Sequence, residues 1–96
     1  MSSFYPLISK EQLPNVVFSH EEVLERADEI KARAEKLVRA ARQGRFFYQK
    51  AGLIIETNFG MRTVHVNIWE ATDHNVLLSG GISIPVCCIH EVTLLS

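Results

Sequence analysis

The residues whose types could do chemistry gather near the C-terminal end of the sequence. Cys88 and His90 are two positions apart, so on a strand they would share one face, which is the minimum for a thiol beside a base. The sequence supplies neither an orienting carboxylate nor an oxyanion hole, and a buried cysteine most often acts as a small apolar residue. We therefore expect no catalytic residue, and a small thiol- or metal-dependent enzyme is the last of three alternatives.

A zinc site is the second chemical possibility. Four side chains supply sulfur and nitrogen donors, namely Cys87, Cys88, His90 and His65. Neither C-x-x-C nor H-x-x-x-H spacing is present, so the pattern does not favour zinc. Gly80-Gly81 precedes a predicted strand rather than a helix, which argues against a phosphate loop. We expect no metal and no cofactor, and the adjacent cysteines do not favour a disulfide with each other.

Basic and aromatic side chains are mixed around residues 39–62, which makes nucleic-acid binding the second alternative. Single-strand binders combine cations for phosphate with aromatic rings for stacking. The candidate residues are Arg39, Arg42, Arg45, Tyr48, Lys50 and Arg62. However, the formal net charge of −1 gives no overall attraction to nucleic acid, and no RNA-binding signature is present.

A protein-interaction or regulatory module is the function we favour. Aromatic side chains concentrate at binding hot spots and are costly to leave in water. The predicted anchors lie on one sheet face and at a turn, namely Ile54, Phe59, His65 and Trp69. They would bind an unidentified protein partner or a second copy of the chain, as a homodimer, through an exposed sheet face or edge.

One long amphipathic helix, over about residues 20–43, must position these candidates. Ser19 and Glu22 have capping-box spacing, and Gly44 follows as a C-terminal cap. The apolar seam steps by four and three through Val23, Ala27, Ile30, Ala34, Leu37 and Ala41, and Val38 widens it. Ion pairs four residues apart are expected for Glu22/Arg26, Glu29/Arg33 and Glu35/Arg39. We expect the helix to cover its own sheet, with a self-associating helix pair as the alternative.

After Gly44 the pattern alternates and predicts a four-stranded antiparallel meander, over about residues 46–57, 62–72, 76–86 and 90–95. The first two strands form a hairpin around Phe59-Gly60, in which Ile55 faces Val64 and one face is apolar. The third strand bends at Gly80-Gly81, and Pro85 implies a sheet edge. One helix followed by such a sheet predicts an α+β fold. The layout resembles the small Sm-like and SH3-like barrels, without any diagnostic motif, and this resemblance implies a small curved half-barrel.

Length and composition indicate one domain over residues 1–96, with residues 1–18 as an apolar N-terminal arm. Ser9 with Gln12 predicts a short helical turn that Pro14 ends. The arm covers the core of its own chain or crosses to another subunit. No apolar run reaches the length of a membrane span, and the N-terminus lacks the order of a signal peptide. We therefore expect a cytoplasmic protein that does not bind a membrane.

Overall fold

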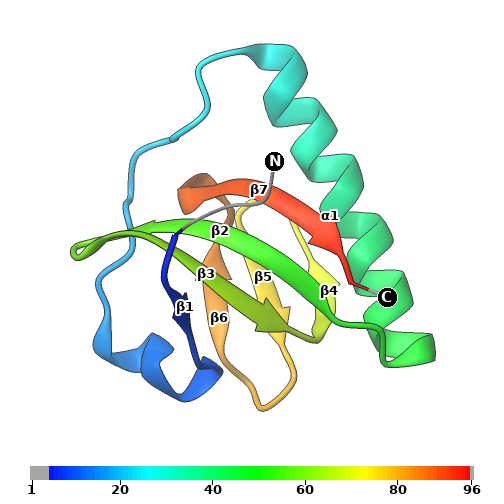
Figure 1. The fold of residues 1–96 in the computed structure, drawn as a ribbon. Helices are drawn as coiled ribbons and strands as arrows, with labels where there is room; N and C mark the ends of the chain where they lie inside the picture. The colour runs from blue at the N-terminus through cyan, green and yellow to red at the C-terminus, as the bar shows by residue number, and fades with distance from the viewer. Residues whose placement is uncertain (1–4, 96) are drawn as a thin grey trace.

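The computed structural model describes residues 5–95 as an α+β fold, which confirms the predicted class. The first four residues of the predicted arm, and Ser96, lie outside the described residues. The elements follow one another along the chain as shown in Figure 1. They are β1 (Leu7–Ile8), the 3-10 helix η1 (Lys10–Asn15), α1 (Ala27–Phe47), β2 (Ala51–Thr57), β3 (Gly60–Val66), β4 (Ile68–Ala71), β5 (Asn75–Leu78), β6 (Ser83–Pro85), the 3-10 helix η2 (Val86–Cys88) and β7 (Ile89–Leu94).

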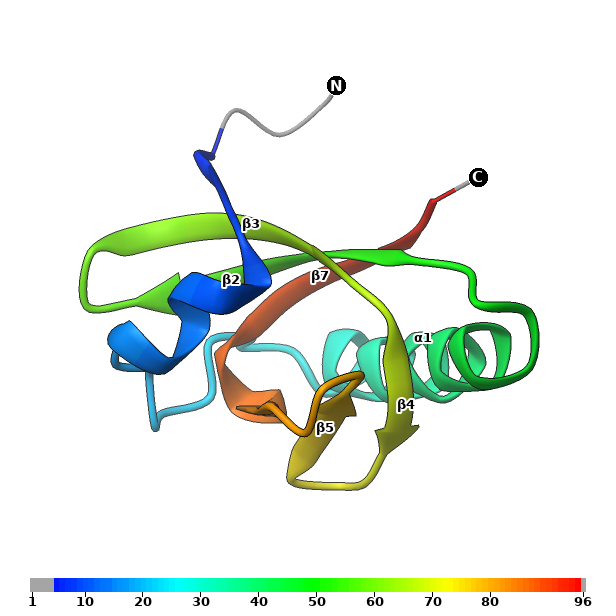
Figure 2. The same ribbon diagram turned by 90° about the horizontal axis from the view of Figure 1, so that it is seen from below.

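These elements form two layers around one apolar core. The first layer is a sheet of order β1-β3-β2-β7, in which β1 runs parallel to β3 and the other neighbours are antiparallel. The second layer is the antiparallel sheet β4-β5-β6, and α1 lies beside β4 in that layer (Figure 2). Buried apolar residues from both sheets and from α1 form one cluster. The two sheets do not close into a barrel.

The segment before α1 packs against its own chain. Leu7 in β1 pairs with Thr63 of β3, and Leu13 in η1 is buried in the core. The predicted helical turn is confirmed as η1: the backbone N–H of Ser9 donates to Oε1 of Gln12 at 2.8 Å, and Pro14 lies near its end.

The predicted helix start at Ser19 is wrong, because α1 begins at Ala27. The preceding backbone bonds to β2 and to η2 instead. The N–H of Ser19 donates to the carbonyl of Glu56 at 3.2 Å, and the N–H of Val23 donates to that of Cys87 at 3.0 Å. A helix from residue 20 would break the second of these bonds, so the segment stays irregular and the predicted capping box does not start α1.

Glu22, in this irregular segment, pairs with a buried arginine of α1. Nη1 and Nη2 of Arg33 donate to the two carboxylate oxygens of Glu22 at 2.6 and 2.5 Å, and Nη1 also donates to the carbonyl of Ile89 at 2.9 Å. The hydrogen bonds from Arg33 hold the pKa of Glu22 below its ordinary value. The three predicted pairs, Glu22/Arg26, Glu29/Arg33 and Glu35/Arg39, are therefore wrong. Within residues 5–95, Arg26 pairs with Asp28 at 3.0 Å and Arg39 forms no ion pair.

The far end of α1 also differs from the prediction. Gly44 lies inside the helix, which ends at Phe47 with Tyr48 as a left-handed cap at φ 56°. The buried face contains Arg33, Leu37, Ala40, Ala41 and Gly44. This buried face is rotated about the helix axis relative to the predicted apolar seam, since Ala27 and Ala34 of that seam are exposed. No helix in residues 5–95 is both long and apolar enough to cross a membrane.

The predicted hairpin is present as β2 and β3, with its register shifted by two residues. The turn is Asn58-Phe59 rather than Phe59-Gly60, and Val64 pairs with Leu53 instead of Ile55. A shift of two leaves every side chain on its predicted face, because strand side chains alternate. The apolar face is therefore buried as predicted, but most of it faces the second sheet rather than α1 (Figure 2).

The two middle strands of the predicted meander are each divided. The strand predicted over 62–72 breaks at Asn67 into β3 and β4, which belong to different sheets. The strand predicted over 76–86 becomes the hairpin β5–β6, where Gly80 and Gly81 take positive φ in the turn. Pro85 lies in edge strand β6, as predicted. The strand order is not that of a meander, because β7 pairs with β2.

Candidate interaction surface

The four predicted partner-binding residues lie on three parts of the molecule. Ile54 and His65 share the outer face of the four-stranded sheet, opposite the side chains that β2 and β3 bury. Phe59 is 61% exposed at the tip of the β2–β3 turn. Trp69 belongs to β4 in the second layer and is 43% exposed. The structure therefore does not join them into one surface.

The basic residues of α1 divide between its two sides. Arg39 lies beside β7, where it lines a shallow groove with Lys36 and residues 91–94. Arg42 and Arg45 lie on the other side and line a groove against β4.

The remaining predicted nucleic-acid contacts lie further apart. Tyr48 is 78% exposed at the end of α1. Lys50 lines a separate cavity beside β1 and η1. Arg62 is half-buried in β3, and its Nη1 donates to the carbonyl of Met61 at 2.9 Å. The six residues do not form one continuous basic track.

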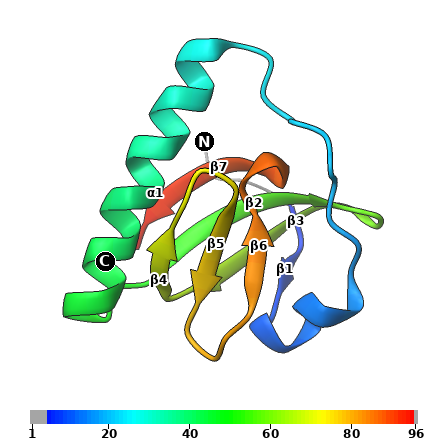
Figure 3. The ribbon, with the colours of Figure 1, turned by 180° about the vertical axis from the view of Figure 1, so that it is seen from behind.

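The groove between α1 and β4 is the place where exposed apolar side chains gather. It has a volume of about 230 Å³ and is lined by Val38, Ala41, Arg42, Arg45, Phe46, Trp69, Glu70 and Ala71. Val38 is 53% exposed and Phe46 is 67% exposed, and both lie beside Trp69 in this lining. We call this surface the aromatic groove. Figure 3 shows α1 and β4 side by side along it.

The helix period explains why these residues meet. Positions 38, 42, 45 and 46 of α1 are spaced by four, three and one, so they lie on one helical face. The helical spacing predicts Val38 at the core stripe, whereas the structure exposes it. A helix that ends at Gly44 predicts Phe46 at the start of a strand, whereas Phe46 lies in the last turn of α1. The available signal was the lack of a breaker other than Gly44 in residues 27–47.

The aromatic groove is more basic than the chain as a whole. Arg42 and Arg45 lie on its helical side, and Glu70 is the one acidic residue in its lining. Across residues 5–95, the ion pairs are Arg26–Asp28 and Arg33–Glu22, and the side chain of His90 also contacts that of Glu56. Neither guanidinium of the groove is therefore compensated by an ion pair within the described chain.

The side chains of Cys88 and His90 each have a hydrogen-bond partner elsewhere, so they do not pair with each other. The thiol of Cys88 is buried and donates to the carbonyl of Pro85 at 3.2 Å. Burial, and then the neighbouring Cys87, raise the pKa of Cys88 to about 12. Nε2 of His90 lies 2.9 Å from Oε1 of Glu56. A thiol with so high a pKa stays protonated at neutral pH and is a weak nucleophile.

The histidines, cysteines and carboxylates of the described chain do not assemble into a cluster. Over residues 5–95, no three of these side chains come together in a way that could hold a metal ion. Comparison of the chain with models of protein families, with curated proteins and with solved structures gave no match.

Proposed function

We propose that this protein is a non-enzymatic interaction module that binds a protein partner through the aromatic groove. The observation that carries the proposal is the gathering of Val38, Phe46 and Trp69, each between 43% and 67% exposed, around one groove. Large apolar side chains that stay in water on a folded surface mark binding sites, and tryptophan and arginine are the residues most enriched at hot spots.

The charges of the groove indicate the chemistry of the partner. Arg42 and Arg45 flank the exposed rings and have no intramolecular ion pair. A partner segment with an apolar anchor between acidic side chains would bury the rings and pair with both guanidinium groups. Such a partner fits the groove better than a neutral or basic one, because like charges across an interface cost binding energy.

Two substitutions in the groove and one control substitution outside it test the proposal. The protein is used to capture partners from extract of its own cells, and binding of the captured partner is then measured with purified proteins. Trp69→Ala and Phe46→Ala should each weaken that binding by about 10-fold or more. Phe59→Ala removes an aromatic ring of similar exposure at the hairpin tip and should leave binding unchanged. Equal losses for Trp69→Ala and Phe59→Ala, or no loss for either, would contradict the proposal.

The partner is proposed to be a different protein, with a second copy of the chain as an alternative that light scattering distinguishes. A homodimer through the aromatic groove should become a monomer in Trp69→Ala. A homodimer through the outer sheet face should instead dissociate in His65→Asp, since that side chain is exposed there. In the second case the binding surface would be the sheet face that the sequence predicts.

Nucleic acid is the second candidate partner, because Arg42 and Arg45 lie beside the rings of Phe46 and Trp69. This combination suits a single strand, with phosphates on the arginines and bases on the rings. Mobility shifts with single- and double-stranded oligonucleotides at increasing salt test it. A shift that Arg42→Gln weakens and high salt abolishes would support nucleic acid, and no shift at low salt would exclude it.

We further propose that the protein acts in the cytoplasm and in a regulatory role. The free thiols of Cys87 and Cys88 support the location, because a reducing compartment keeps such thiols free. Fluorescence microscopy of the tagged protein in its own cells tests this part of the proposal.

A further inference from the structure

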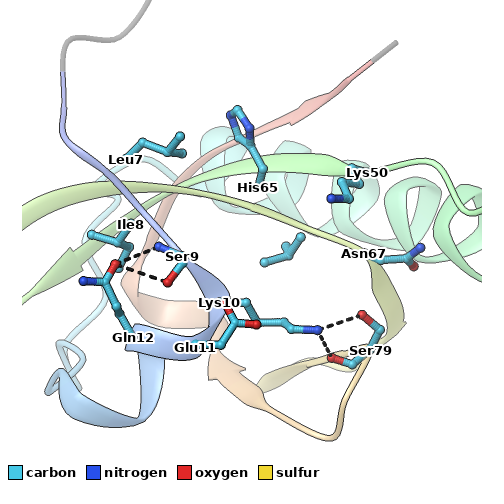
Figure 4. A pocket seen from close by; sticks show the side chains of 11 residues that line it. Leu7, Ile8, Ser9, Lys10, Glu11, Gln12, Lys50, His65, Asn67 and Ser79 are labelled. Carbon is cyan, nitrogen blue, oxygen red and sulfur yellow. Dashed lines mark hydrogen bonds between the residues drawn. The ribbon is translucent and has the colours of Figure 1, made fainter.

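A second cavity lies between the N-terminal segment and the end of β3. Its volume is about 600 Å³, within the range of small-molecule sites. Its lining comes from four places in the chain: residues 7–12, Lys50, the end of β3 and Ser79 in the β5–β6 turn. Figure 4 shows Lys10 reaching towards Ser79 on one side of this space, with Lys50 on the other side and the ring of His65 turned away from Lys10.

The N-terminal segment is fastened over this space at two points. The β1 segment pairs with β3 through Leu7 and Ile8. Nζ of Lys10 donates to the carbonyl oxygen of Ser79 at 3.1 Å and to its hydroxyl oxygen at 3.4 Å. An ammonium group has three donors and both of these acceptors are neutral, so the bonds to Ser79 leave the cation without a counter-charge and one N–H of Lys10 available for another partner. The wall of the cavity therefore carries an uncompensated cation in a partly buried place.

The charge balance of the cavity is positive, whereas the chain has a net charge of −1. Lys10 and Lys50 line the cavity, and Glu11 is the one acidic side chain among the lining residues. Neither lysine takes part in an ion pair within residues 5–95. The rest of the lining combines the apolar side chains of Leu7 and Ile8 with hydrogen-bonding ones, including those of Ser9 and Gln12. This mixture of an apolar wall and a few polar groups is typical of sites that bind small organic molecules.

We infer that this cavity binds a small organic phosphate. Two separate ammonium groups act as point charges, which suits a doubly charged tetrahedral phosphate, whereas a carboxylate is better matched by the planar fork of an arginine. The phosphate lies between Lys10 and Lys50. The organic part of the ligand lies against Leu7 and the ring of His65, which are both exposed. The site is separate from the aromatic groove, since the two linings have no residue in common.

Nuclear magnetic resonance titration of the whole protein tests this inference, with adenosine monophosphate, inorganic phosphate, adenosine and benzoate as separate probes. Adenosine monophosphate at millimolar concentration should shift the amide signals of residues 8–12, 65–67 and 79. Inorganic phosphate should shift the same signals at higher concentration, because it lacks the organic part. Adenosine and benzoate should bind at least about tenfold more weakly than adenosine monophosphate.

Lysine variants provide the matched controls. Lys50→Gln removes an exposed cation whose side chain makes no hydrogen bond within residues 5–95, and it should weaken binding of adenosine monophosphate about tenfold. Lys10→Gln should weaken it similarly, and its spectrum also reports whether the N-terminal segment keeps its position. Lys31→Gln makes the same charge change on the exposed side of α1 and should leave binding unchanged.

Four outcomes would overturn the inference, and three of them concern the phosphate probes and the lysine variants. These are no shift of the cavity signals with either phosphate probe, unchanged binding in Lys50→Gln, and equal weakening in Lys31→Gln, which would indicate general attraction to anions. Binding of adenosine or benzoate as tight as that of adenosine monophosphate would also refute a phosphate site.

Discussion

Gly44 and Ile68 are in backbone contact where α1 crosses β4. A β-carbon on Gly44 would lie 2.2 Å from the carbonyl oxygen of Ile68 and 2.8 Å from Oδ1 of Asn67. Real β-carbons do not approach other atoms so closely, so only glycine allows the helix to lie at this distance from the strand. The contact also places Trp69, the next residue of β4, at the edge of the aromatic groove.

Gly44→Ala should destabilise the protein although alanine is the better helix former. The clash is with backbone atoms that cannot rotate away, so we expect a loss of about 1–3 kcal/mol of unfolding free energy. The gain in helix propensity is at most about 1 kcal/mol. Urea denaturation followed by circular dichroism measures the difference.

Gly52→Ala is the control for that variant. Its β-carbon would lie 3.6 Å from His65 and from Leu95, which is ordinary contact. We expect a change of less than about 1 kcal/mol, because β2 already has regular strand geometry there. A Gly44→Ala protein as stable as the wild type would show that α1 does not lie so close to β4.

Glu22→Gln should destabilise the protein by about 1–3 kcal/mol, since it leaves the charge of the buried Arg33 with a neutral partner. Asp28→Asn is the matched control, because its pair with Arg26 is exposed on both sides and should contribute less than about 1 kcal/mol. Urea denaturation of both variants at neutral pH makes the comparison. Equal effects would mean that Glu22 does not hold Arg33.

The same pair predicts how stability depends on pH. Since folding lowers the pKa of Glu22 from 4.5, its contribution is fully present above pH 4.5 and is lost as the pH falls through the lower folded value. Unfolding free energy measured between pH 7 and pH 3 should therefore fall less steeply below pH 4.5 in Glu22→Gln than in the wild type. Parallel curves would contradict the assignment.

The two adjacent thiols should react at very different rates. With a pKa of about 12, the thiolate fraction of Cys88 at pH 8 is on the order of 10⁻⁴. Cys87 is half-buried, so alkylation with iodoacetamide at pH 8 should label it first. Peptide mass spectrometry over time measures both rates, and the denatured protein is the control in which both should react. Faster labelling of Cys88 than of Cys87 in the folded protein would contradict this prediction.

The sequence predicts the local features of the fold better than the contacts between distant segments. The faces of β2 and β3 follow from alternation, which survives a register shift of two residues. The predicted start of α1 is wrong. Ser19 has the sequence spacing of a helix cap, but its N–H bonds to the carbonyl of Glu56, 37 positions away. The prediction that Gly44 ends the helix is wrong for the same reason. Glycine is required there because the backbone of Ile68 lies against it, and only the folded chain brings these two residues together.

The candidate surface was predicted only in part for related reasons. Trp69, Arg42 and Arg45 were singled out from their residue types, but on two separate surfaces. Joining them required the bend at Asn67, which moves Trp69 out of the first sheet and towards α1. Val38 is apolar and lies at a helical position that could face the core equally well, so nothing local shows that it remains exposed.

The pairing of β7 with β2 has a consequence for how the chain folds. The β2–β3 hairpin forms between residues that are close in sequence, whereas the β2–β7 ladder joins residues such as Leu53 and Val92, 39 positions apart. Such non-local pairing is slow relative to hairpin closure. Until β7 arrives, β2 presents an unpaired apolar edge, which is a template for association with other chains. The rate at which β7 docks therefore sets how long the newly made protein is exposed to aggregation.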